Sequence, residues 1–230
     1  MTSAPPPIAV FDLDGTLADT APDLIATLNA VLDREGVPGL PVDQARELIS
    51  AGGRALLDRG LEAAGREVTP AKLEMLYRAF LAHYGENICV STRLYPGAVD
   101  ALDRLQGAGF RLAICTNKME AHSVRLLEAL GVADRFATIC GRNTFPWFKP
   151  DPRHLTMTID RARADARRAV MVGDSYSDVT AAKAAGIPVV ALSFGYADRP
   201  LIELEPDRIV DRYDELFDAI AACVPVLEAA

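Results

Sequence analysis

Tryptophan, histidine and cysteine are scarce in this chain. Its 230 residues include one tryptophan, three histidines and four cysteines. The cysteines stand far apart in apolar surroundings, which favours reduced core thiols over a disulfide framework. No cysteines or histidines stand at the spacing of a zinc site. The composition therefore argues against a fold stapled by disulfides or zinc.

Basic residues are also few, with 24 Lys and Arg against 32 Asp and Glu and a net charge of −8. Nucleic-acid binding calls for clustered basic side chains, so we expect no nucleic-acid partner. No apolar run approaches the roughly 18 residues of a membrane helix, and the first residues lack the pattern of a secretory signal. We expect a cytoplasmic globular protein without a membrane partner, and the sequence carries no signal for its oligomeric state.

Short apolar segments that alternate with helical stretches make up most of the chain. Such alternation predicts βαβ units and a doubly wound, Rossmann-like parallel sheet, which places the protein in the α/β class. The predicted strands are residues 8–12, 111–115, 136–140, 169–172, 188–192 and 208–210.

Residues 19–95 interrupt this alternation, because apolar side chains recur there at helical spacing. Glycines and prolines divide the block into about four helices, and Thr69 with Pro70 is a typical start for the last one. We therefore expect an α/β catalytic core formed by residues 1–18 and 96–230, with an inserted four-helix cap domain at 19–95.

The most informative motif is FDLDGT, residues 11–16, directly after the first predicted strand. It sets the carboxylates of Asp12 and Asp14 two residues apart, and Gly15 lets the backbone turn sharply. One carboxylate can attack phosphorus while the other handles a proton, and carboxylates are ligands that magnesium prefers. The motif predicts a magnesium and phosphoryl-transfer site.

Three further polar clusters follow later strands and are expected at the same sheet edge. Residues 116–118 (TNK) supply phosphate donors, Lys149 supplies a cation, and Asp174 with Asp178 supplies carboxylates. Each cluster alone fits a turn, a solvated lysine or a helix cap. Together, in this order after successive strands, they predict one active site.

The four motifs FDLDGT, CTNK, KPDP and VGDSYSD resemble the signatures of the haloacid dehalogenase superfamily, in its branch of phosphatases with a helical cap. The resemblance implies that Asp12 is the nucleophile that forms an aspartyl phosphate and that Asp14 is the general acid and base. It further implies magnesium held by Asp12, by the backbone carbonyl of Asp14 and by Asp174, with Asp178 outside the direct ligand set. Dehalogenases of the superfamily lack the second aspartate, so Asp14 points to phosphoryl transfer.

The same resemblance implies that Thr116 and Lys149 take part in catalysis, and that Asn117, Gly15 and Lys118 contribute to substrate binding. Looser likenesses to phosphoglycolate phosphatases favour 2-phosphoglycolate, a small anionic phosphate ester, as the substrate. They are residues 52–57, 116–118, 192–196 and 205–207.

Arg54 follows two glycines in a predicted cap loop and is a candidate partner for a substrate carboxylate. A solvent-facing helix arginine fits the same pattern equally well. The bulky residues 146–148 before Lys149 depart from the family pattern near the leaving group.

Other functions fit parts of this pattern. Within the superfamily they are a sugar phosphomutase resembling β-phosphoglucomutase, a pyrophosphatase and a nucleotidase, and outside enzymes a phosphate-sensing module. Thr16 after Gly15 favours a hydrolase over a mutase, and an intact set of catalytic residues argues against a mere sensor.

Overall fold

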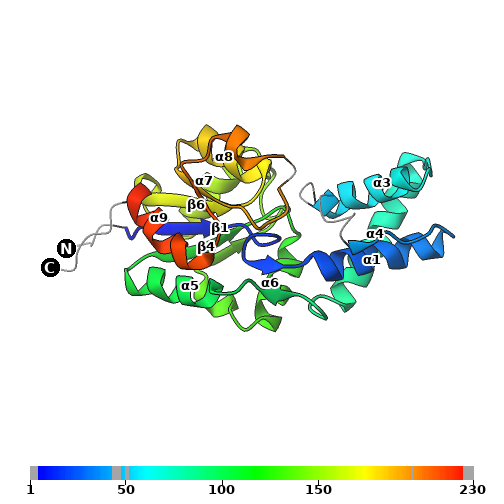
Figure 1. Cartoon of the computed structure of the whole chain (residues 1–230), viewed down its shortest axis with the longest axis horizontal. Coiled ribbons are helices and arrows are strands. Elements are labelled where there is room, and N and C mark those ends of the chain that lie inside the picture. Colours follow the sequence, from blue (N-terminus) through cyan, green and yellow to red (C-terminus); the bar gives the residue numbers. More distant parts are fainter. Residues whose placement is uncertain (1–4, 43–47, 50–51, 198, 225–230) are drawn as a thin grey trace.

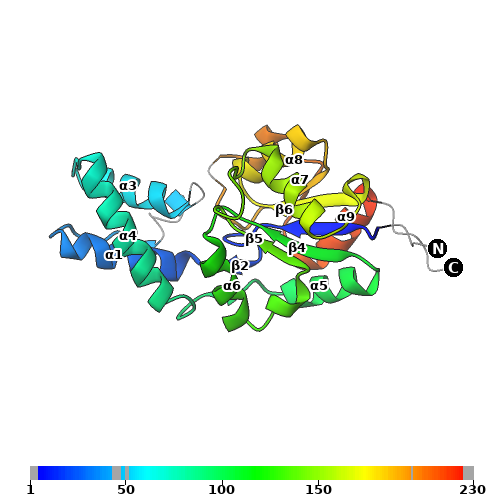
Figure 2. The same ribbon diagram turned by 180° about the vertical axis from the view of Figure 1, so that it is seen from behind.

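The computed structural model describes residues 5–42, 48–49, 52–197 and 199–224, and all statements below concern them. Figures 1 and 2 show a sheet flanked by helices and, beside it, a separate group of helices built around α1, α3 and α4. We call this second group the helical insert. The molecule is therefore an α/β core with a helical insert, as the sequence predicted.

A six-stranded sheet forms the centre of the core, in the order β5-β4-β1-β6-β7-β8, and every neighbouring pair is parallel. All six strands coincide with predicted ones, so the predicted sheet is confirmed. Their bounds are β1 (Ile8–Phe11), β4 (Arg111–Cys115), β5 (Thr138–Cys140), β6 (Ala169–Gly173), β7 (Val189–Leu192) and β8 (Arg208–Val210).

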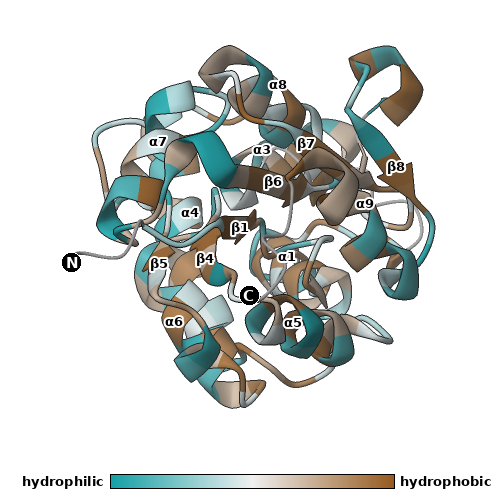
Figure 3. Ribbon diagram, turned by 90° about the vertical axis from the view of Figure 1, so that its left-hand side faces the viewer, coloured by the Kyte–Doolittle hydropathy of each residue, from teal (hydrophilic) through white to brown (hydrophobic). Residues whose placement is uncertain are grey.

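Helices cover both faces of this sheet, and Figure 3 shows its brown, apolar strands between them. Alternate residues of one strand supply the two faces, so Ala9 and Phe11 pack with α5, α6 and α9, and Ile8 and Val10 with α7 and α8. The helices are α5 (Ala98–Gly107), α6 (Glu120–Ala129), α7 (Pro152–Arg161), α8 (Tyr176–Ala185) and α9 (Leu216–Cys223). Short 3-10 helices are η2 (Ala133–Arg135), η3 (Ala166–Arg168), η4 (Leu201–Leu204) and η5 (Tyr213–Glu215).

The helical insert has a hydrophobic core of its own, in which Leu28, Leu57 and Phe80 are buried. Thr69 begins the last helix as predicted, since its hydroxyl accepts the Lys72 N–H at 3.3 Å. The insert contains α1 (Ala21–Arg34), α3 (Gly53–Ala63) and α4 (Pro70–Glu86). A fourth helix predicted between α1 and α3 falls largely outside the described residues.

Two short antiparallel strands, β2 (Ala18–Asp19) and β3 (Arg93–Leu94), join the insert to the core. The sequence did not predict these strands, because two residues are too few to show a periodic pattern. Beside them, the buried Asp23 carboxylate accepts the backbone N–H groups of Val90, Ser91 and Thr92 at 2.9–3.1 Å. The two linkers are thereby tied to each other.

The chain runs from β1 to β4 and β5 on one side of the sheet, and through β6, β7 and β8 on the other. The carboxyl end of β1 consequently lies at the point where the strand order reverses, which is where open α/β sheets bind ligands. Among the described residues, no helix is both long enough and apolar enough to cross a membrane.

Candidate active site

Three central strands deliver polar residues to one edge of the sheet. Asp12 directly follows β1, Thr116 follows β4 and Asp174 follows β6. After Asp12 the chain turns at Gly15, whose φ is +82° and where an added Cβ would lie 2.5 Å from Oδ2 of Asp174. Only glycine fits this close approach of the two loops.

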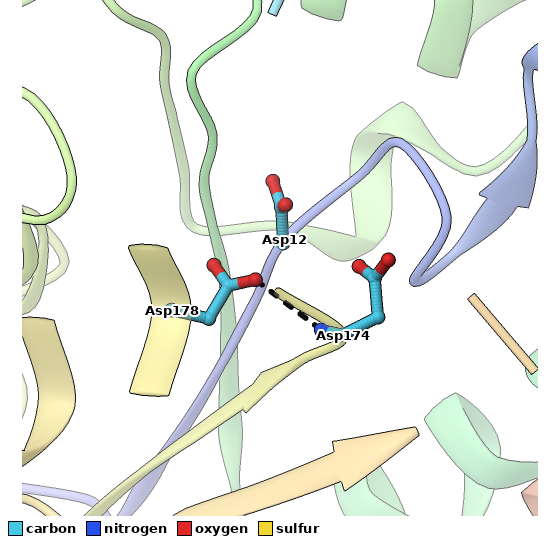
Figure 4. Close-up of side chains that lie close together, drawn as sticks. All are labelled: Asp12, Asp174 and Asp178. Atoms are coloured by element: carbon cyan, nitrogen blue, oxygen red, sulfur yellow. Dashed lines mark hydrogen bonds between the residues drawn. The ribbon is translucent and has the colours of Figure 1, made fainter. Parts of the chain in front are cut away.

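The carboxylates of Asp12, Asp174 and Asp178 form a buried acidic cluster in which one oxygen of each lies within 4.8 Å of the others. Figure 4 shows the three side chains converging from the end of β1, the end of β6 and the first turn of α8. The dashed line marks the Asp174 N–H donating to Oδ2 of Asp178 at 3.2 Å. Such a cluster is stable only with positive charge close by.

Lys149 supplies part of that charge. Its ammonium lies 3.0 Å from Oδ1 of Asp12 and 2.5 Å from Oδ1 of Asp178, and the lysine is 1% exposed. Burial works against its charge, but the two carboxylates outweigh burial and raise the pKa of Lys149. Burial raises the pKa of Asp12 to about 6, although Lys149 opposes the shift. Lys149 therefore holds the side chain that the sequence assigned as nucleophile.

Asp178 has both carboxylate oxygens engaged by the protein. While Oδ1 accepts from Lys149, Oδ2 accepts the backbone N–H of Ser175 at 3.1 Å and its hydroxyl at 2.6 Å, which caps α8. One residue thus serves both as a helix cap and as a partner of Lys149. These contacts fix Lys149 and the loop after β6 in place.

Asp174 has a different environment. Its oxygens accept the hydroxyl of Thr16 at 2.5 Å and the backbone N–H of Tyr196 at 2.6 Å, and within the described ranges no lysine or arginine forms an ion pair with it. Burial and then the charges of Asp178 and Asp12 raise the pKa of Asp174 well above its ordinary value. A divalent cation between Asp12 and Asp174 would relieve this repulsion, so the donor set fits a metal that prefers oxygen ligands.

Asp14 pairs with a second lysine. Nζ of Lys118 lies 2.9 and 3.2 Å from the two oxygens of Asp14, and 4.3 Å from the centre of the Tyr84 ring. Burial disfavours the ammonium, but Asp14 and Tyr84 together outweigh burial and raise the pKa of Lys118. Tyr84 belongs to α4, so this second pair lies where the core meets the helical insert.

The remaining predicted phosphate donors lie at the same edge. Thr116 is 1% exposed, and its hydroxyl accepts the backbone N–H of Lys118 at 3.2 Å. Asn117 donates its amide to the backbone carbonyl of Lys149 at 2.9 Å, which ties two of the predicted clusters together. The structure thus brings together Asp12, Asp14, Gly15, Thr116, Asn117, Lys118, Lys149, Asp174 and Asp178.

A cavity of about 60 Å³ lies between this edge and the insert. Asp12, Asp14 and Asp174 line it from the core, and Tyr84 lines it from the insert. Arg54 does not line this cavity: it borders an adjoining one of about 240 Å³, and its guanidinium pairs with Glu74 at 2.5 Å. The predicted partner of a substrate carboxylate therefore stands apart from the acidic cluster.

Sequence reasoning missed the contacts that two tyrosines make at the site. Tyr84 was one apolar position of a predicted helix, and nothing in its neighbours along the chain indicates Lys118 as its contact. Tyr196 contacts Asp174 through its backbone, and its hydroxyl reaches the insert, where it accepts the Ala21 N–H at 2.8 Å and donates to Asp19 at 2.5 Å. Such contacts depend on the fold and leave no local sequence signal.

Comparison with known proteins places this geometry in a family. Residues 9–192 match the model of the haloacid dehalogenase-like hydrolases. A protein named phosphoglycolate phosphatase from Mesorhizobium japonicum is 50% identical over 91% of this chain and 92% of its own length. Another protein of that name, from Agrobacterium fabrum, is 42% identical over 96% of this chain and 95% of its own length.

Solved structures agree with this assignment. The crystal structure of a predicted phosphoglycolate phosphatase from Haemophilus somnus is similar with a TM-score of 0.85 and 31% identity, over 92% of this chain and 96% of that one. CbbY from Rhodobacter sphaeroides, in complex with phosphate, has a TM-score of 0.78 and 26% identity over 92% and 96%. From its motifs, its fold and these matches, the chain belongs to the haloacid dehalogenase-like hydrolases.

Proposed function

We propose that the protein is a magnesium-dependent phosphomonoesterase that hydrolyses 2-phosphoglycolate through an aspartyl phosphate. The observation that carries the proposal is the buried Asp12, which lies 3.0 Å from Lys149 and beside the metal-suited Asp174. The names of the relatives from Mesorhizobium japonicum and Agrobacterium fabrum support the substrate.

The chemistry takes two steps. A carboxylate oxygen of Asp12 attacks phosphorus while Asp14 gives a proton to the leaving oxygen, so that the P–O ester bond breaks and glycolate departs. Asp14 then takes a proton from water, which attacks phosphorus, releases phosphate and restores the Asp12 carboxylate. Lys149 offsets negative charge beside Asp12 throughout.

Magnesium would be held by the carboxylates of Asp12 and Asp174 and by the backbone carbonyl of Asp14, and it would neutralise charge on the transferring phosphoryl group. Asp178 would keep Lys149 and the loop after β6 in place. The ligand set leaves coordination positions for water and for the phosphate.

Thr116, Asn117 and Gly15 would hold the phosphate oxygens. The hydroxyl of Thr116 and backbone N–H groups at the turn are donors that a phosphate accepts. Asn117 contributes by fixing the backbone of Lys149, to which it donates. Positioning of this kind supplies most of the catalysis in phosphoryl transfer.

We further propose that residues 19–95 act as a cap that moves over the sheet edge, with residues 1–18 and 96–230 as the catalytic core. The cavity lies between Asp12 and Asp14 of the core and Tyr84 of the insert, so a movement of the insert would widen or narrow the space for a substrate. The β2 and β3 pair is the natural hinge, because both linkers pass through it.

Phosphate release from a panel of esters tests the proposed function. The panel holds 2-phosphoglycolate, hexose phosphates, nucleotides and pyrophosphate, each with Mg²⁺ and with EDTA. We expect the highest kcat/KM for 2-phosphoglycolate and no turnover in EDTA. Isomerised sugar phosphate without phosphate release would identify a mutase instead. Equal activity with EDTA and with Mg²⁺ would show that the reaction needs no divalent metal ion.

A further inference from the structure

Tyr84 is a buried side chain of the helical insert at the cavity. It is 1% exposed, and it lines the cavity that contains Asp12 and Asp14. The centre of its ring lies 6.4 Å from that of Phe80, in a stacked arrangement, and 5.5 Å from that of His122, in an edge-on arrangement. Its buried hydroxyl finds no acceptor for its proton in the part of the chain that the structure describes, because the neighbouring ammonium of Lys118 can only donate to it. A buried hydroxyl without an acceptor is costly, and its presence at a binding cavity indicates that a ligand supplies the acceptor.

The chemistry of that acceptor follows from the groups around the hydroxyl. Burial raises the pKa of Tyr84 to about 12, so the hydroxyl keeps its proton and can donate. The ammonium of Lys118, 4.3 Å from the centre of the same ring, is a second donor and carries positive charge. Two buried donors side by side, one of them cationic, are suited to a carboxylate.

The position of these donors matches the leaving group. Because Asp14 protonates the leaving oxygen, that oxygen lies about 3 Å from the Asp14 carboxylate during the reaction. Nζ of Lys118 is 2.9 Å from the nearer oxygen of the same carboxylate. In 2-phosphoglycolate one methylene separates the leaving oxygen from the carboxylate, whose oxygens lie roughly 2.6–3.6 Å from it by ordinary bond lengths. The substrate carboxylate thus reaches the ammonium.

We propose that Lys118 and the hydroxyl of Tyr84 form the subsite that binds the carboxylate of the leaving group, and that the pair selects phosphate esters of short 2-hydroxy acids. The inference rests on the proposed function, since it assigns a part of that substrate. One donor comes from the core and the other from the insert, so the subsite is complete only when the insert lies over the sheet edge. Substrate selection and closure are thereby linked.

Arg54, the partner predicted from the sequence, is the rival for this role. Arg54 already forms an ion pair with Glu74, and Glu74 also pairs with Arg78. Arg54 borders the cavity of about 240 Å³ and not the one that contains Asp12 and Asp14. A carboxylate at Arg54 would also leave the Tyr84 hydroxyl without an acceptor. Lys118 and Arg54 therefore give opposite predictions for the same substrate.

The test compares kcat/KM for 2-phosphoglycolate with kcat/KM for ethyl phosphate, in which a methyl group replaces the carboxylate. We expect the wild-type protein to prefer 2-phosphoglycolate. Tyr84→Phe, which keeps the ring, should lower that preference about 10- to 100-fold, the usual range for a lost hydrogen bond to a charged group. Lys118→Met should lower it by about 100-fold or more, since a charge is lost as well.

Tyr77→Phe is the matched control, because Tyr77 lies on the same helix and lines the same cavity but sits beside Arg54. We expect its preference, and that of Arg54→Met, to equal the wild-type value. Collapse of the preference in Arg54→Met with retention in Tyr84→Phe and Lys118→Met would overturn the inference, as would a wild-type protein that prefers neither ester. If wild type hydrolyses another ester of the panel and neither of these two, the proposed function itself fails.

Discussion

Two lysine and aspartate pairs stand at the same sheet edge and differ in what surrounds them. Lys149 and Asp12 form their ion pair within the core, with Asp178 of α8 as the third member. Lys118 and Asp14 form their ion pair at the boundary of the core, where the ring of Tyr84 from the helical insert lies against Lys118. Under the proposed mechanism, this difference means that the reacting centre belongs to the sheet, whereas the environment of the leaving group is shared between core and insert.

This division has a physical basis. Lys149 is held by two carboxylates at 3.0 and 2.5 Å, and its geometry is fixed before any substrate binds. Lys118 has one carboxylate and an aromatic face, so a ligand anion can take over part of its coordination. Under the proposed mechanism, the residues that carry out the reaction therefore lie in the core, whereas the residues proposed to select the substrate come from both the core and the insert.

The largest effect on the leaving-group side is expected from Asp14→Asn. Without its proton donor, the alkoxide of an alkyl ester is a poor leaving group, and we expect kcat for 2-phosphoglycolate to fall by about 10²–10⁴-fold. Turnover of p-nitrophenyl phosphate, whose leaving group needs less protonation, should fall less. Equal losses for both esters would show that Asp14 does not protonate the leaving group.

On the core side, Lys149→Met removes the cation that the sheet supplies. Three carboxylates then face one another without it, and we expect kcat to fall by about 10²–10³-fold and the free energy of unfolding to fall by about 3–5 kcal/mol. Steady-state kinetics and urea unfolding measure the two. Lys118→Met is the comparison, and a larger loss of unfolding free energy there than in Lys149→Met would contradict the division.

The core could be predicted to this degree because its signals are local. Each strand shows as an apolar run, and Asp12, Thr116 and Asp174 directly follow β1, β4 and β6, so strand order alone brings them together. The contact of Tyr84 with Lys118 joins residues that only the fold brings together, and the pairing of Arg54 with Glu74 joins two helices of the insert. Neither contact follows from periodicity or spacing.

The pH dependence of stability tests a buried titratable group of the core. His154 of α7 is fully buried. Burial, followed by the charge of Lys149, lowers the pKa of His154 from 6.5 to about 4. Between these pH values the unfolded chain binds a proton that the folded one does not, so stability falls as pH falls through this window.

The expected loss from this residue is about 2 kcal/mol between pH 7 and pH 5. His154→Phe keeps an aromatic ring beside Phe145 and removes the titrating group. Urea unfolding at the two pH values should therefore show a smaller loss in the variant than in the wild-type protein. An identical loss in both proteins would mean that His154 does not take part.

The smallest expected effect concerns the link between the two regions. Tyr196→Phe removes the hydroxyl that contacts Asp19 and the Ala21 N–H at the start of α1, while its backbone contact with Asp174 stays. We expect about 1 kcal/mol of lost stability and a rise in KM of about two- to fivefold, because closure of the insert weakens.

Tyr213→Phe is the matched control, since its buried hydroxyl donates to the backbone carbonyl of Thr16 within the core at 2.7 Å. It should cost similar stability and leave KM unchanged. Equal rises of KM in both variants would show that the hydroxyl of Tyr196 has no special role in closure. Thermal unfolding and steady-state kinetics on both proteins decide the matter.

The central claim is that the Asp12 carboxylate becomes covalently phosphorylated during turnover. The most direct measurement is rapid acid quenching of the protein during turnover of ³²P-labelled 2-phosphoglycolate, followed by mapping of the labelled peptide. We predict label on the peptide that contains Asp12, and none in Asp12→Asn protein that is folded but inactive. Phosphate release by the wild-type protein without label on that peptide, or normal turnover by Asp12→Asn, would contradict it.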